Sequence, residues 1–148
     1  MSLEKRSSLA IVAVVLAAAA SAAMRFGLSN SGGEGRVIAS GRFHQVAHKG
    51  SGLANVCRLP DGKLVLRFTE FRTDHGRDLQ VLLIAAPDAL ENETVAKSDR
   101  VSLGPLEGSA GDQSYPLPDD LDVHKFRAVT IWSSKYLVNF TTAPLSLE

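Results

Sequence analysis

The stretch that most constrains the fold is residues 125–145, which has the pattern of two β-strands joined by a tight connection. Its sequence, KFRAVTIWSSKYLVNFTTAPL, is rich in the β-branched and aromatic residues that strands favour. Because side chains alternate between the two faces of a strand, Val129 and Ile131 are predicted to face one way and Trp132 the other. After a Ser-Ser-Lys connection, Tyr136 is predicted to begin the second strand. We expect a central hairpin of a β-domain.

Short segments of strand-like composition recur from residue 36 onward, separated by turn residues. Leu64, Leu66 and Phe68 alternate with other residues, which is typical of a sheet with one dry face. The Pro-Asp-Gly sequence at 60–62 predicts a turn, since proline presets φ and glycine accepts a positive φ. Residues 86–97 are polar and predict a helical turn. The other predicted strands are residues 37–46, 53–59, 63–68, 79–85, 101–106 and 113–117. This spacing predicts an all-β fold, either an antiparallel sandwich or a small barrel. Of the two we predict an antiparallel β-sandwich of jelly-roll or immunoglobulin-like type.

The N-terminus has the pattern of an export segment. Lys5 and Arg6 precede residues 9–24, which are apolar and uncharged. This run fits either a cleaved signal peptide or a retained anchor helix, although a spanning helix needs roughly 20 apolar residues. We therefore predict a signal peptide or membrane anchor at 1–24, a linker at 25–35, a β-domain at 36–146 and vector-derived residues at 147–148. Either interpretation of the first segment places the domain outside the cytoplasm, in the periplasm or at the cell surface.

Composition narrows the classes of function. The formal net charge is zero, which argues against nucleic acid as a partner because phosphate binding needs a basic face. A single cysteine excludes an intramolecular disulfide and a four-thiolate zinc site. No Gly-x-Ser-x-Gly elbow and no recognisable carboxylate pair is present, so a hydrolase ranks last and we expect the chain not to be an enzyme. Contact with a membrane is expected only through the N-terminal segment.

Several short motifs, taken in order, resemble the electron transfer DM-thirteen domain family over residues 36–145. Each motif is weak alone, but the ordered set is fairly specific. The matching pieces are Gly41-x-Phe43, His48-Lys49-x-Ser51-Gly52, Leu64-x-Leu66 with Phe71, Asp78-Leu79 after Gly76, Leu103-Gly104-x-Leu106, Gly111-x-Gln113-x-Tyr115-x-Leu117-Pro118, Val129-x-Ile131-Trp132, Phe140 and Ala143-x-Leu145.

The resemblance implies an extracytoplasmic β-domain with a role in electron transfer. That role is linked to a cysteine directly after the Ile-Trp pair, acting as a free thiol or holding a prosthetic group. Here the position is Ser133, and a hydroxyl is neither a thiolate nor a soft ligand. Cys57 lies elsewhere, so its default interpretation is a buried inert thiol and the alternative is a relocated redox thiol. Ser133, Trp132 and Cys57 are the candidate cofactor-binding residues, and no catalytic residue is predicted.

We therefore predict a binding or accessory module with a protein or small-ligand partner at the outer face of a membrane. The alternative is a redox or electron-transfer component that uses a thiol, haem or metal. No cofactor is predicted under the leading interpretation, and its ligand stays unknown. No metal site is predicted either, although His48 and Asp78 are weak candidates. His44 and His75 also lie in this part of the chain, and these four residues could converge at strand ends.

Overall fold

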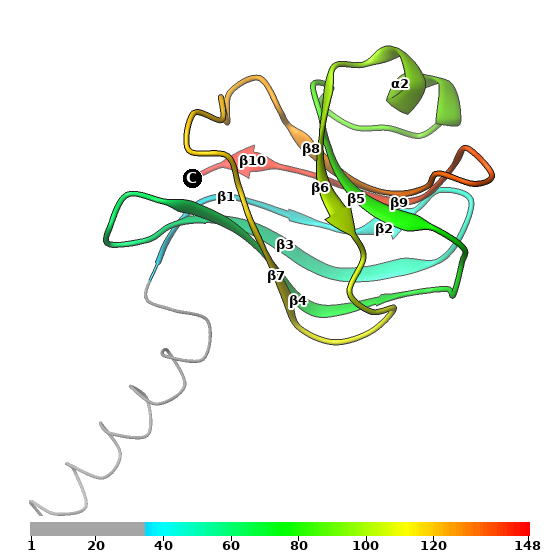
Figure 1. The fold of residues 1–148 in the computed structure, drawn as a ribbon, viewed down its shortest axis with the longest axis horizontal. Coiled ribbons are helices and arrows are strands. Elements are labelled where there is room, and N and C mark those ends of the chain that lie inside the picture. The colour runs from blue at the N-terminus through cyan, green and yellow to red at the C-terminus, as the bar shows by residue number, and fades with distance from the viewer. Residues whose placement is uncertain (1–34) are drawn as a thin grey trace, which may run out of the picture. The chain divides into compact units, whose positions relative to one another are not determined.

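The computed structural model describes residues 35–148, which form two antiparallel β-sheets packed face to face (Figure 1). The prediction of an antiparallel sandwich is confirmed at this level. The predicted export segment at 1–24 lies outside the described residues. Residues 35–148 contain no helix with the length and hydropathy of a membrane span.

The first sheet, called here the β3 sheet, has the strand order β10-β1-β3-β4-β7. Two neighbouring strands of this sheet, β3 and β4, form the hairpin predicted around the Pro-Asp-Gly turn, where Leu59 N donates to Lys63 O. The edge strand β7 contains a proline, which cannot donate to a ladder and is therefore tolerated at an edge. The strands are β1 (Arg36–Arg42), β3 (Gly50–Arg58), β4 (Leu64–Thr73), β7 (Gln113–Pro116) and β10 (Ser146–Leu147).

The second sheet, called the β8 sheet, has the order β2-β9-β8-β5-β6. The predicted C-terminal hairpin supplies its two central strands. The nearly continuous apolar run at 79–85 supplies the strand beside them, which is buried along most of its length. The strands are β2 (His44–Gln45), β5 (Leu79–Ile84), β6 (Arg100–Pro105), β8 (Ala128–Ser133) and β9 (Val138–Pro144).

The main core lies between the sheets and follows the predicted alternation. Val129 and Ile131 of β8 point into it, together with Leu66 and Phe68 of β4. A smaller apolar cluster covers the outer face of the β8 sheet. It lies beneath the predicted helical turn, which forms α2 (Asn92–Lys97) and buries Val95 (Figure 1). The β8 sheet is therefore covered on both faces.

The prediction for the connection between β8 and β9 is wrong at Tyr136. The turn spans residues 134–137, and Tyr136 lies in it with 59% of its surface exposed. The reason lies in two hydrogen bonds to the residue that ends β8. Leu137 N donates to Ser133 O at 2.8 Å, and Tyr136 N donates to Ser133 Oγ at 3.3 Å. These bonds close a turn one residue longer than the alternating pattern suggests, and Leu137 adopts a left-handed φ of 56°.

The last residues also join the fold. Leu147 pairs with Ala39, and Glu148 N donates to Ile38 O at 2.9 Å. The origin of residues 147–148 and the boundaries of the domain stay predictions.

Candidate functional site

One end of the domain, called here the loop end, is built from residues 74–78 and the turn 134–137. Ser133 connects these two segments through hydrogen bonds. It is fully buried between Leu79 of β5 and Val138 of β9. Its hydroxyl donates to Arg77 O at 2.9 Å and accepts from Tyr136 N. The one hydrogen of the Ser133 hydroxyl is therefore already donated, and the side chain has a structural role at this position.

The backbone of residues 74–78 is held closely against the β8 sheet. Asp78 has a left-handed φ of 52°, and its carbonyl accepts from Ser134 N at 3.0 Å. At Gly76, an added Cβ would lie 2.4 Å from Cζ of Phe140, a distance that real side chains do not reach. Any larger residue at position 76 would therefore force the Phe140 ring or the segment to shift.

A histidine caps the same ring on another side. The His48 imidazole stacks on Phe140 with the ring centroids 3.9 Å apart and the planes 25° from parallel. Its Nδ1 lies 3.0 Å from Oδ2 of Asp74, and its backbone N donates to Phe140 O at 3.0 Å. His48 is therefore fixed by a ring, a carboxylate and a backbone carbonyl. The carboxylate that His48 contacts belongs to Asp74, and not to Asp78, the other weak candidate for a metal site.

Among the described residues, 35–148, three surface hollows meet at this end, and His75 lines all three. The largest, about 540 Å³, includes Lys49 and Arg72. The smallest, about 300 Å³, contains Asp78. The third, about 320 Å³, is called here the Tyr136 hollow. Its lining residues are His48, His75, Gly76, Arg77, Tyr136, Val138 and Phe140.

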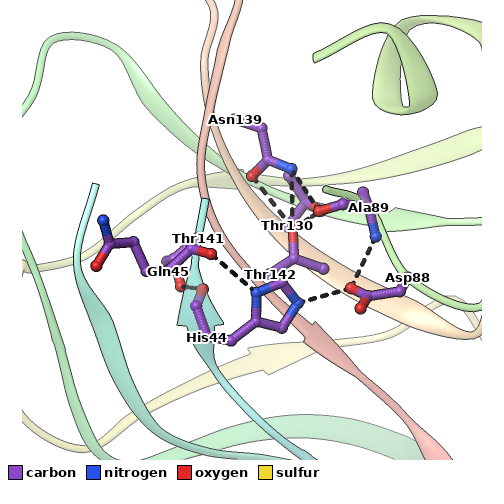
Figure 2. A network of polar contacts seen from close by, with 8 residues as sticks. All are labelled: His44, Gln45, Asp88, Ala89, Thr130, Asn139, Thr141 and Thr142. Carbon is purple, nitrogen blue, oxygen red and sulfur yellow. Dashed lines mark hydrogen bonds and ion pairs between the residues drawn. The ribbon is translucent and has the colours of Figure 1, made fainter. Parts of the chain in front are cut away.

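A second polar cluster lies between the β8 sheet and the segment that carries α2 (Figure 2). His44 Nε2 is 2.7 Å from Oδ1 of Asp88, which also accepts from Ala89 N at 2.8 Å. Burial lowers the pKa of His44, but the hydrogen bonds to Asp88 and to Gln45 O outweigh it, so the pKa is raised above its usual value.

Beside that pair, fully buried amide and hydroxyl groups are joined to one another (Figure 2). Asn139 Nδ2 donates to Ala89 O at 3.2 Å and to Thr142 Oγ1 at 2.9 Å. The Thr142 hydroxyl lies 3.1 Å from Asn139 Oδ1 and 2.9 Å from Thr130 Oγ1. The backbone N of Asn139 donates to Oδ1 of Asn92 at 2.8 Å. These bonds hold the α2 segment on the sheet. Sequence analysis missed them, and the only signal was the polar Asn-Phe-Thr-Thr run inside a predicted strand.

The family model described as Electron transfer DM13 matches residues 42–145. The chain belongs to the electron transfer DM13 family. No curated protein and no solved structure matches the chain.

The three candidate cofactor residues of this DM13 domain are not brought together. Trp132 follows Ile131 with the opposite orientation and packs against the small cluster under α2, away from the main core. Cys57 lies in the β3 sheet between Val37 and Val65, whereas Ser133 belongs to the β8 sheet. Cys57 also lies seven residues along β3 from Gly50, whose partner Thr73 adjoins the loop end, so Cys57 does not take the place of a thiol at position 133.

The environment of Cys57 disfavours the reactive thiolate. The side chain is buried, and burial raises the pKa of its thiol, while nearby Arg67 acts in the opposite direction without overcoming the rise. A thiol with a raised pKa stays protonated at neutral pH, so it is a poor nucleophile and a poor metal ligand.

The donor groups of the DM13 domain do not fit a thiolate-held prosthetic group at position 133. Ser133 supplies a hydroxyl that is already hydrogen-bonded to Arg77 O. Within residues 35–148, no three histidine, cysteine or acidic side chains lie close enough to hold a metal ion together. Four residues could have converged at strand ends. Of these, His48 and His75 share the Tyr136 hollow, Asp78 lines an adjoining one with His75, and His44 pairs with Asp88.

Proposed function

We propose that this DM13 domain is an exported binding or accessory module whose loop end recognises a small ligand or a protein partner. The observation that carries the proposal is the Ser133 hydroxyl, which is buried and committed to the backbone of Arg77. A residue used in this way shapes the surface in front of it and does not carry electrons. Export follows from the interpretation of residues 1–24, and a position at the outer face of a membrane follows from the anchored form.

The rest of the loop end supports recognition. The Tyr136 hollow combines an exposed phenol and an exposed guanidinium with apolar surface from Val138 and Phe140. Ligand sites in proteins are commonly apolar hollows with a few polar groups that fix orientation. The ring of Phe140 is held by His48 and Gly76, so the floor of the hollow is formed before any ligand arrives.

The alternative is electron transfer through a haem or metal at the same end. It is supported by the family description and by the two imidazoles of His48 and His75, which line one hollow. Imidazole is a common ligand of both kinds of group. The two functions make opposite predictions for protein isolated from the compartment to which it is exported.

An optical spectrum of such protein, free of any histidine tag, tests the proposal. We expect no visible band and less than a tenth of an equivalent of metal. Cys57 should react with a disulfide reagent about 100-fold more slowly in the folded protein at pH 7.5 than in denaturant, because burial keeps it protonated and covered. A stoichiometric haem or metal band would overturn the binding module in favour of electron transfer.

Localisation and recognition are tested separately. Cell fractionation and the mass of the mature N-terminus report whether residues 1–24 export or anchor the domain. A fragment screen followed by amide NMR reports recognition, with shifts expected at residues 74–78 and 134–140 and not at the turn 59–63. Shifts spread evenly over both ends of the domain would contradict a site at the loop end.

A further inference from the structure

The lining of the Tyr136 hollow indicates the class of ligand, an inference that rests on the proposed function. Its floor and one wall are apolar or aromatic. Phe140 is almost wholly buried beneath the His48 ring and Gly76, Val138 is partly buried at the start of β9, and the Tyr136 ring stands in the turn with most of its surface exposed. Flat aromatic surface favours a ligand with a planar apolar body.

Charge at the rim is mainly positive. Arg77 is exposed and makes no ion pair with any residue between 35 and 148. Lys135 Nζ lies 5.6 Å from the centroid of the Tyr136 ring. Of the nearby acids, Asp74 is engaged by His48, and Asp78 opens into the neighbouring hollow. A guanidinium without an acidic partner, beside apolar surface, is suited to a carboxylate.

The size and charge of the Tyr136 hollow disfavour other ligand classes. A volume of about 320 Å³ is at the lower end of ligand sites, which favours a body of one or two rings. An organic cation is disfavoured because Arg77 in the lining and Lys135 beside the Tyr136 ring both carry positive charge. A nucleotide or other polyanion is disfavoured because Asp74 stands at the His48 side of the rim.

We propose that the Tyr136 hollow binds a small planar carboxylate, with its ring against Tyr136 and Val138 and its carboxylate on the Arg77 guanidinium. The backbone of Arg77 is fixed by the bond from Ser133 Oγ, so the guanidinium extends from an anchored position.

The probes are 2-naphthoate and its neutral analogue 2-naphthamide, titrated into the domain and followed by amide NMR shifts. We expect naphthoate to bind at least tenfold more tightly than naphthamide. Arg77→Gln should weaken naphthoate about tenfold and leave naphthamide within about twofold, since only the charge-assisted hydrogen bonds are lost. Arg36→Gln is the matched control. Arg36 lies opposite Arg58 in the ladder between β1 and β3, at the end of the β3 sheet away from the loop end.

A second variant separates ring from charge. Tyr136→Ala should weaken the binding of both probes by similar factors. The variant should keep the turn, because Ser133 Oγ accepts a hydrogen bond from the backbone N of residue 136 and not from its side chain. Equal affinity for the two probes would overturn the ligand class, as would equal effects of Arg77→Gln and Arg36→Gln. If neither probe binds at 10 mM while other fragments shift the loop-end amides, this inference fails and the proposed function stands. If no fragment shifts those amides, both fail.

Discussion

The domain contains two histidine–aspartate pairs, and their surroundings differ. His44 and Asp88 lie 2.7 Å apart, with 32% and 38% of their side chains exposed, beside the buried Asn139 network. His48 and Asp74 lie 3.0 Å apart, are 39% and 51% exposed, and border an open hollow. The first pair fastens one segment to a sheet, and the second shapes a surface. The same two residue types thus hold structure at one place and line an open hollow at another.

The largest expected effect is at the buried Asn139 network that holds the α2 segment on the β8 sheet. Asn139→Ala should lower the free energy of unfolding by about 2–3 kcal/mol, because it removes buried hydrogen bonds to Ala89 and Thr142 and leaves their polar atoms unpaired. Urea unfolding measures this, with His48→Ala as the comparison. His48→Ala should cost about 1 kcal/mol or less, since that residue is partly exposed. If the two variants were equally destabilised, the contrast between the regions would be broken.

A smaller effect is expected where the loop end meets the core. Gly76→Ala should lower the free energy of unfolding by about 1–2 kcal/mol, because its Cβ would overlap Cζ and Cε2 of Phe140. Amide shifts should change at residues 74–78. Gly108→Ala is the control in a nearby loop, where the closest atom to an added Cβ is 3.7 Å away. A Gly76→Ala protein as stable as the Gly108→Ala protein would show that the loop end is softer than described.

The smallest effect concerns the pH dependence of the His44–Asp88 pair. The folded pKa of His44 is raised above the unfolded value of 6.5. The extra stability is therefore fully present below 6.5 and is lost as pH rises through the folded pKa. It should amount to less than about 1 kcal/mol, because both side chains are about one-third exposed.

Unfolding free energies measured from pH 5.5 to 8.5 should show this decline, and Asp88→Asn should flatten it. A decline that persists in Asp88→Asn but disappears in Asp74→Asn would assign the pH-sensitive role to the other pair.

The sandwich itself could be predicted because alternation reports a dry face directly. The positions of β4, β5 and the C-terminal hairpin follow from residues such as Leu66, Val81 and Ile131, which all lie in the core. The assignment to a jelly-roll or immunoglobulin-like type stays a prediction, as do the signal or anchor at residues 1–24 and the extracytoplasmic location.

The candidate site could be predicted only in part. His48 and His75 converge because antiparallel pairing brings Gly50 opposite Thr73, a register that no local pattern specifies. The Asn139 network was missed because the α2 segment covers the outer face of the β8 sheet, which makes polar residues on that face buried. Tyr136 was misplaced because a hydroxyl, and not a strand partner, satisfies its backbone N.

The two left-handed residues of the loop end, Asp78 and Leu137, have a thermodynamic consequence. Asp78 and Leu137 lie on either side of the hydrogen bonds made by Ser133. Neither is a glycine, so each adopts a backbone conformation that an unfolded chain rarely visits. The cost of ordering this rim is met when the domain folds. For the carboxylate proposed above, association should therefore carry little conformational entropy penalty from the protein. A rigid ligand should then bind more tightly than a flexible ligand of equal contact area.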